Sequence, residues 1–198
     1  RFQSMKKVLI NKNHVKLEDL VTDFNYDKGV LQHFEGDKVF VTGITGFIGK
    51  VFLEILLRKI VGIQTLYLLI RKVKNRSPES RLQDIFNLPL FDRLRNENPS
   101  GVDKIRIIEG DASLPMLGMD PKVWQELQDE VTLVYHAAAS VRFDDPLKKA
   151  ILLNTRGTYE VVKFCQNMTK LRCLTYVSTA YCNTDYDVIS EQVYPPKA

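Results

Sequence analysis

The sequence predicts an α/β fold in which helices cover both faces of a doubly wound parallel sheet. Apolar runs of strand length alternate with stretches whose apolar residues recur at helical spacing. A turn containing three glycines joins the first apolar run to the first helical stretch, and small, polar or charged residues follow every run. Right-handed crossovers between parallel strands then give the strand order 3-2-1-4-5.

The first strand, the first helix and the second strand form one unit of about thirty residues. Residues 39–41 are an apolar strand, and a helix begins at Phe47, after which apolar residues recur every three to four positions. A second apolar strand covers residues 66–70. This strand-helix-strand unit is the frame that a dinucleotide-binding turn requires.

The remaining elements continue the alternation toward the end of the chain. Ser77 and Asp120 each precede a proline, which is favoured at the first position of a helix, so both residues mark helix starts. From residue 77 onward we expect a helix at 77–86, a turn at 90–95, a loop at 98–101, a strand at 104–109, a helix at 120–127, a strand at 131–135, a helix at 145–168 and a strand at 173–177.

The chain is expected to divide into two parts. Residues 1–36 form a polar N-terminal extension with a possible short helix at 17–24, and residues 37–198 form one Rossmann-like domain. Because methionine first occurs at Met5, and the chain stops just after a Pro-Pro pair, we expect an N-terminal fragment whose domain lacks its C-terminal part.

The glycine turn predicts a site for the pyrophosphate of a dinucleotide. Gly43 permits a tight turn, Gly46 removes a Cβ that would block the phosphates, and Gly49 allows the helix to pack closely on the strand. The start of the helix then offers free N–H donors and the positive end of its dipole to an anion. A structural turn without a ligand is the alternative. The cofactor-binding residues predicted here are Thr42, Gly43, Thr45, Gly46, Phe47, Ile48 and Gly49.

The end of the second strand predicts which dinucleotide binds. NAD sites usually place an acid there to accept hydrogen bonds from the adenosine ribose, but this chain has Arg71 and Lys72 and no acid from residue 60 to residue 78. A carboxylate would repel a 2′-phosphate, whereas a guanidinium binds it through two hydrogen bonds. We therefore predict NADPH as the cofactor, with a solvated basic loop as the alternative.

Further candidates lie at the ends of later strands and on the helix at 145–168. Asp111 accepts a hydrogen bond from the adenine amino group or is a simple turn aspartate, and Ala112 follows it. Ala137 and Ala138 leave room for the nicotinamide ribose and the pyrophosphate or reflect tight helix packing. Asn154 holds a proton-relay water at a helix kink or is a polar surface position.

Composition excludes several classes of function. The net charge is only +4 with dispersed basic residues, which argues against a nucleic-acid-binding protein. The three cysteines have no metal-ligand spacing, so we expect reduced thiols in a cytosol-facing compartment and no metal site. No apolar run approaches the roughly twenty residues needed to cross a bilayer, and no signal peptide is visible. His136 is expected to be buried and hydrogen-bonded rather than catalytic.

Five segments make the chain resemble the alcohol-forming fatty acyl-CoA reductases, which belong to the extended branch of the short-chain dehydrogenase/reductase superfamily. The first segment is shared by all extended members, whereas the last three together are much more specific to the reductases. The segments are VTGITGFIGKV at 41–51, LFDRLR at 90–95 with ENP at 97–99, HAAASVRFD at 136–144, VSTAYCN at 177–183 and VYPP at 193–196.

The resemblance implies a reaction and its catalytic groups. The parent protein would reduce a long-chain fatty acyl-CoA to a primary alcohol with NADPH. A hydroxyl of Thr179 or Ser178 would polarise the carbonyl, and a Tyr-x-x-x-Lys pair would donate the proton. The only such motif here, from Tyr159 to Lys163, lies upstream of the fifth strand, so the catalytic pair is expected beyond Ala198 and the 198-residue chain should be inactive alone.

The resemblance also implies a membrane-associated parent protein that faces the cytosol on the endoplasmic reticulum or the peroxisome. Two other functions stay open. One is a different extended reductase or epimerase, such as a hydroxysteroid dehydrogenase. The other is a non-catalytic NADPH-binding module.

Overall fold

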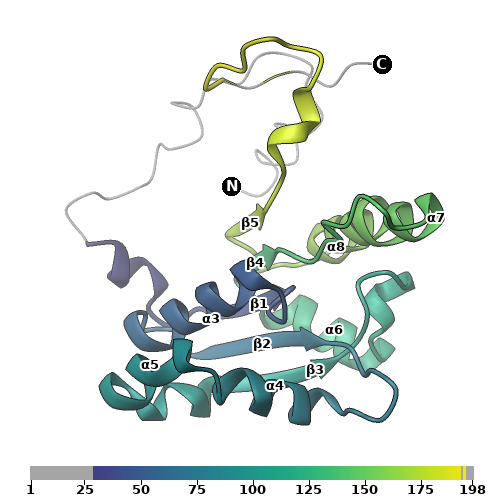
Figure 1. Cartoon of the computed structure of the whole chain (residues 1–198). Coiled ribbons are helices and arrows are strands. Elements are labelled where there is room, and N and C mark those ends of the chain that lie inside the picture. Colours follow the sequence, from purple (N-terminus) through teal and green to yellow (C-terminus); the bar gives the residue numbers. More distant parts are fainter. Residues whose placement is uncertain (1–28, 193, 195–198) are drawn as a thin grey trace.

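The computed structural model describes residues 29–192 and residue 194 of the chain (Figure 1). Its centre is one sheet of five strands in the order β3-β2-β1-β4-β5, with every neighbouring pair parallel. This confirms the predicted fold class and strand order. The strands are β1 (Lys38–Thr42), β2 (Thr65–Ile70), β3 (Ile105–Glu109), β4 (Leu133–His136) and β5 (Cys173–Tyr176).

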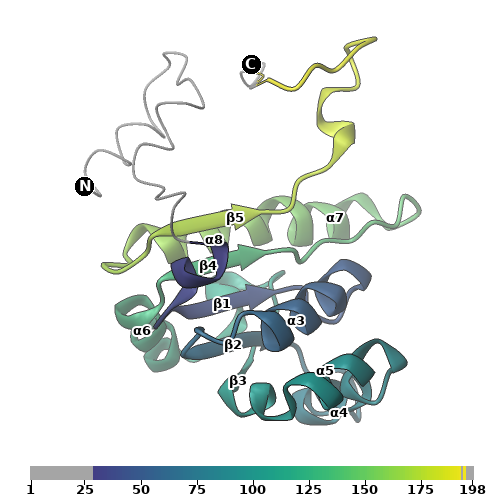
Figure 2. The same cartoon turned by 90° about the vertical axis from the view of Figure 1, so that its left-hand side faces the viewer.

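Helices lie on both faces of the sheet, as a doubly wound fold requires (Figure 2). α3, α4 and α5 cover one face, and α6 and α8 cover the other. Among the described residues, no helix combines the length and the apolar character needed to cross a bilayer. The helical segments are η1 (Val30–Phe34), α3 (Phe47–Lys59), α4 (Pro78–Phe86), η2 (Pro89–Phe91), α5 (Asp92–Glu97), η3 (Pro99–Lys104), η4 (Pro115–Gly118), α6 (Pro121–Glu130), α7 (Leu147–Ala150), η5 (Ile151–Arg156), α8 (Gly157–Gln166) and η6 (Ala180–Asn183).

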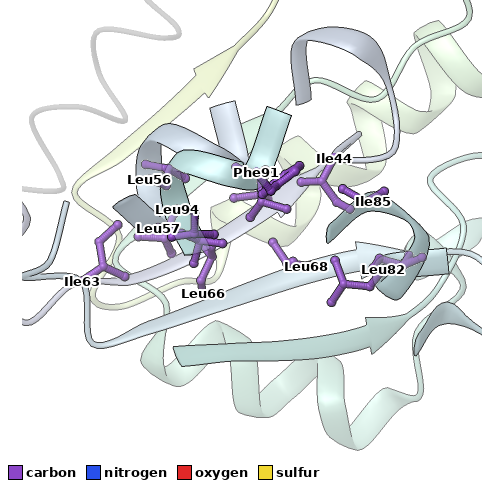
Figure 3. Close-up of a cluster of buried hydrophobic side chains, with 14 of the residues drawn as sticks. Ile44, Leu56, Leu57, Ile63, Leu66, Leu68, Leu82, Ile85, Phe91 and Leu94 are labelled. Carbon is purple, nitrogen blue, oxygen red and sulfur yellow. The ribbon is translucent and has the colours of Figure 1, made fainter. Parts of the chain in front are cut away.

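Alternate residues of the central strands enter two separate cores. Val39 and Val41 of β1 pack with α3, α4 and α5, in the cluster that Figure 3 shows. Phe40 points to the opposite face, where its ring lies 5.1 Å from the ring of Phe164 on α8. Trp124 of α6 contacts the same Phe164 ring at 4.5 Å, so it joins α6 to α8 within this second core. Burial on both sides fixes the sheet rigidly beneath the loops that follow its strands.

Several predicted boundaries were wrong by a few residues. β4 begins at Leu133 rather than residue 131, because Val131 is the C-cap of α6 and its N–H bonds to the Leu127 carbonyl. The loop expected at 98–101 is largely the 3₁₀ turn η3. The helix expected at 145–168 spans residues 147–166, and its middle segment η5 is π-helical. The helix expected at 17–24 lies outside the described residues.

An ion pair between a buried aspartate and a half-exposed arginine lies at the amino end of the sheet. Asp37, which is 3% exposed, precedes β1, and Arg172 precedes β5. The Arg172 Nη1 atom lies 2.8 Å from both carboxylate oxygens of Asp37 and donates to the His33 carbonyl. Thr132, just before β4, donates its hydroxyl hydrogen to Asp37 at 2.8 Å. These bonds tie three strand starts together.

Candidate cofactor site

A cavity of about 210 Å³ lies at the carboxyl ends of the strands. Residues that follow β1, β2, β3 and β4 line it, and the neighbours β1 and β4 are where the strand order changes direction. Ligands of open α/β sheets bind at this position. The lining residues are Thr42, Gly43, Thr45, Gly46, Leu69, Ile70, Arg71, Arg81, Gly110, Asp111, Ala112, Ala137, Ala138, Ala139 and Leu153.

The glycine turn has the geometry that close approach of a ligand requires. Gly43 has a φ of +82°, and a Cβ there would lie 2.4 Å from the carbonyl carbon and oxygen of Ala137. A Cβ on Gly49 would lie 2.2 Å from the Gly43 oxygen, so this glycine lets α3 pack against the turn. Gly46 meets only the Gly43 oxygen, at 3.3 Å, and its open side faces the cavity. The predicted roles of Gly43 and Gly49 agree with these distances.

The start of α3 presents backbone donors rather than side chains. Gly46 is the N-cap, and no side chain caps the helix. The side chains of Phe47 and Ile48 are 83% and 60% exposed, and neither lines the cavity. These two residues, predicted from the sequence to bind cofactor, can therefore contribute only through their N–H groups and the positive end of the helix dipole.

A series of hydrogen bonds connects Thr42, just before the glycine turn, to α8 on the other face of the sheet. The Thr158 hydroxyl donates to the Asn154 carbonyl at 2.7 Å, so its oxygen accepts from His136 Nε2 at 3.1 Å. His136 Nδ1 is then the acceptor for the Thr42 hydroxyl, 2.7 Å away. The Thr42 oxygen in turn accepts the Ala138 N–H at 3.3 Å. Thr42 thus lines the cavity and also holds the backbone of Ala138, another lining residue, in place.

His136 is a neutral structural histidine. It is fully buried, and burial lowers the pKa of its imidazole to about 4. A group that stays uncharged near neutral pH and is bonded at both nitrogens is unsuited to transfer protons. This agrees with the expectation from the sequence.

Asn154 clamps the loop after β4. Its Oδ1 accepts the Ser140 N–H at 2.8 Å, and its Nδ2 donates to the Ser140 carbonyl at 3.0 Å. Asn154 lies in the π-helical segment η5, where the helix is locally widened. Asn154 is thus half-buried and bonded to Ser140, the helix around it is π-helical, and its role in holding a proton-relay water stays a prediction.

Basic residues form the rim of the cavity beyond β2. Arg81 of α4 donates to the Arg71 carbonyl at 2.6 Å, and both arginines line the cavity. Burial lowers the pKa of Arg81, and the neighbouring charges of Arg71 and Arg76 lower it further. Lys72, predicted with Arg71, is exposed and lies outside the lining. Arg81 was not predicted, because its ten-residue separation from Arg71 in the sequence hides their contact.

The charges on this rim are unequally compensated. Arg71 lies 3.6 Å from Asp111, and Arg76 pairs with Asp84. Among the described residues, no carboxylate lies within ion-pairing distance of Arg81. A partly buried cation beside like charges, without an acid of its own, favours the binding of an anion.

Asp111 makes the contacts of a turn aspartate. Its Oδ1 accepts the Ser113 N–H at 2.9 Å and the Ser113 hydroxyl at 2.7 Å. Burial, the strongest influence, raises the pKa of Asp111, but the bonds from Ser113 and the charge of Arg71 together outweigh it and leave the pKa lowered. Its neighbour Ala112 is buried, and its carbonyl oxygen would lie 2.6 Å from a Cβ placed on Gly157.

The predicted catalytic hydroxyls lie outside the cavity lining. Ser178 and Thr179 follow β5 and are exposed. The Thr179 oxygen accepts the Tyr181 N–H at 3.2 Å, which leaves its hydroxyl hydrogen free to donate. Tyr159 is 59% exposed, with the Lys163 ammonium 5.5 Å from its ring centroid, and neither residue lines the cavity. The Tyr159–Lys163 motif is therefore separate from the site.

The sequence and its geometry can now be compared with known proteins. The NAD-binding family described as Male sterility protein matches residues 41–198. The chain belongs to this family. Membership confirms the nicotinamide cofactor that the glycine turn predicts, and the basic rim of the cavity makes NADPH the form that fits it.

Fatty acyl-CoA reductases are among the relatives of this male sterility family member, as its motifs predicted. The chain is 40% identical over 193 residues to fatty acyl-CoA reductase wat of Drosophila melanogaster. The aligned residues make up 95% of this chain and 37% of that protein. It is 39% identical over 165 residues to fatty acyl-CoA reductase 1 of Gallus gallus, covering 83% of this chain and 32% of that protein. The chain therefore spans well under half the length of these curated relatives.

Solved reductase domains share the fold. The terminal R domain of the myxalamid biosynthetic pathway has a TM-score of 0.60 and 28% identity, covering 73% of this chain and 35% of that one. The reductase domain of a nonribosomal peptide synthetase from Mycobacterium tuberculosis has a TM-score of 0.57 and 28% identity, covering 79% of this chain and 38% of that one.

Proposed function

We propose that this chain is the NADPH-binding part of an enzyme that reduces a fatty acyl-CoA to a primary alcohol. The observation that carries the proposal is the cavity itself, which combines a glycine turn that admits a pyrophosphate with Arg81, a guanidinium that has no acid partner among the described residues. The substrate class rests on the names of the relatives in Drosophila melanogaster and Gallus gallus.

Each part of the cavity fits one part of the cofactor. The N–H groups at the start of α3 would bind the pyrophosphate over Gly43 and Gly46. Arg81 and Arg71 would bind the 2′-phosphate, which a guanidinium recognises through paired hydrogen bonds. Ala137 and Ala138 have side chains small enough to leave the strand end open to the nicotinamide ribose. When bound, NADPH supplies the hydride.

Thr179 is the residue we propose to polarise the substrate carbonyl. Its oxygen already accepts a backbone hydrogen bond from Tyr181, so its own hydrogen is directed toward another acceptor. Ser178 is the alternative donor. Tyr159 is, like Thr179, exposed and outside the cavity lining, but it lies upstream of β5 and packs with Lys163, so we propose that a different tyrosine is the proton donor.

Calorimetric titration of the 198-residue chain with NADPH and with NADH tests the cofactor proposal. We expect tighter binding of NADPH, and Arg81→Gln should weaken it about tenfold while NADH binding changes little. Lys72→Gln is the matched control, since this exposed side chain lies outside the cavity, and should change either affinity less than about threefold. Equal affinity for the two cofactors, or binding of neither, would contradict the proposal.

A second test concerns the reaction. We expect no NADPH-dependent reduction of acyl-CoA by the 198-residue chain, and reduction to alcohol by a protein that extends through a downstream Tyr-x-x-x-Lys. Removal of the Thr179 hydroxyl by Thr179→Val in that protein should lower the turnover about 100-fold or more. Turnover of a sterol or a nucleotide sugar instead of acyl-CoA would identify another extended reductase or epimerase, and binding without any turnover would identify a non-catalytic module.

We also propose that the longer protein associates with a membrane of the endoplasmic reticulum or peroxisome, on its cytosolic side. The support is chemical, because a long-chain alcohol product partitions into lipid. Fractionation of cells that express the tagged longer protein tests this, and recovery only in the soluble fraction would contradict it.

A further inference from the structure

A left-handed turn beside the cavity contains two successive non-glycine residues with positive φ. Met116 and Leu117 in η4 have φ values of +52° and +54°, and Gly118 follows at +65°. Side-chain-bearing residues rarely adopt this region, and the conformation is unfavourable unless the surroundings enforce it. Two such residues in succession therefore need an external support.

The support comes from Glu160 of α8. Its carboxylate is 3% exposed, and its Oε2 accepts the Met116 N–H at 3.0 Å. Arg156 and Lys163 lie 3.9 Å and 3.6 Å from the same carboxylate, on the solvent side, and balance its charge. A buried carboxylate held by two flanking cations and aimed at one backbone N–H fixes the position of that N–H.

The turn is hydrogen-bonded to Asp111, which lines the cavity. The Leu117 carbonyl accepts the Asp111 N–H at 2.7 Å, and Leu117 itself is fully buried. Asp111 and Ala112 line the cavity next to the basic rim. Gly157, one helical turn before Glu160, brings α8 against the Ala112 carbonyl. Glu160 and Gly157 thus hold both ends of the segment that follows β3.

We infer that Glu160 is a positioning residue for the adenylate half of the cofactor, acting through the left-handed turn at 116–118. This inference rests on the proposed function, because it assigns the Asp111 side of the cavity to the adenosine of NADPH. It explains why a carboxylate that takes no part in the reaction is buried in the middle of the Tyr159–Lys163 motif.

The test is the affinity of the 198-residue chain for adenosine 2′,5′-bisphosphate, measured by calorimetry. Glu160→Ala should weaken binding about tenfold, because it leaves the Met116 N–H unpaired and the turn unsupported. Glu160→Gln keeps an acceptor oxygen and should stay within about threefold of the native chain. Met116→Gly in the Glu160→Ala background should restore most of the affinity, because glycine adopts a positive φ without support.

The outcomes separate the inference from the proposed function. If the native chain does not bind adenosine 2′,5′-bisphosphate, the proposed function fails. If it binds and Glu160→Ala binds equally well, the positioning role is wrong. If Glu160→Ala loses affinity and Met116→Gly does not restore it, Glu160 acts through the general stability of α8, which also overturns the inference. If Glu160→Ala does not fold, Gly118→Ala tests the turn by itself, because its Cβ would lie 3.0 Å from the Asp111 nitrogen, and unchanged affinity would overturn the inference.

Discussion

The two ends of the sheet use polar groups in opposite ways. At the amino end, Asp37, Thr132 and Arg172 satisfy one another through hydrogen bonds and an ion pair. At the carboxyl end, the first N–H groups of α3 have no capping side chain, and no acid among the described residues pairs with Arg81. Both ends are polar, so polarity alone does not identify a site. What distinguishes the carboxyl end is hydrogen-bonding capacity that the protein leaves unused.

Two glycines with nearly the same backbone conformation give the strongest test of this difference. Gly43→Ala should abolish detectable NADPH binding and cost several kcal/mol of stability, because its Cβ would overlap the Ala137 carbonyl group. Gly36, before β1, has a φ of +75° and open space around it. Gly36→Ala should cost only about 1 kcal/mol and leave NADPH affinity unchanged. Urea unfolding and NADPH titration of both variants provide the measurements.

An equal loss of binding in the two variants would mean that backbone strain, rather than the approach of β1 to the end of β4, limits the site. These two glycines would then no longer distinguish the carboxyl end of the sheet from the amino end.

The pH dependence of stability offers a second way to separate the ends, since His136 belongs to the carboxyl end alone. Its pKa is about 4 in the folded chain and 6.5 when unfolded. The unfolded chain therefore binds the proton more readily, so stability is fully present above pH 6.5 and is lost as the pH falls toward 4. The loss should reach about 3 kcal/mol over this window. Urea unfolding at several pH values measures it.

His136→Asn is the control for this prediction. The variant should be less stable at pH 7, but the part of the pH dependence between pH 6.5 and 4 that belongs to His136 should vanish. A native chain whose stability is flat over that window would contradict a buried neutral histidine.

A substitution at the amino end of the sheet should lower the stability of the protein without changing its affinity for NADPH. Arg172→Met leaves the Asp37 carboxylate buried with Thr132 as its one side-chain partner among the described residues. Since Arg172 is itself about half exposed, we expect a loss of about 2 kcal/mol rather than the larger cost of breaking a fully buried pair. NADPH affinity of the folded protein should not change. A weakened affinity in calorimetry would show that the two ends are coupled through the sheet.

The smallest effect is expected at Tyr159. Tyr159→Phe removes a hydroxyl that is exposed and distant from the cavity lining, so stability should change by less than about 0.5 kcal/mol and NADPH affinity not at all. In the longer protein, acyl-CoA reduction should also be retained. Loss of that reduction would make the Tyr159–Lys163 motif catalytic after all.

Local signals in the sequence were sufficient for the architecture and for the glycine turn. Gly43 and Gly49 could be assigned because each role depends on the absence of one atom at a fixed place in a strand-to-helix turn. Arg81 could not, because a helix that folds back across β2 brings it to Arg71. The left-handed turn at 116–118 was also missed, since neither Met116 nor Leu117 favours a positive φ and its side-chain support comes from Glu160, 44 residues from Met116.

The hydrogen bonds around His136 run in one direction, from Thr42 through the imidazole to Thr158 and the Asn154 carbonyl. One consequence is spectroscopic. The neutral imidazole carries one N–H hydrogen, on Nε2, which lies between a strand and a helix, so its exchange with solvent must wait for the structure to open. In a nuclear magnetic resonance spectrum, this hydrogen would give one slowly exchanging signal. Its appearance during refolding would mark the moment when β1, β4 and α8 have come together.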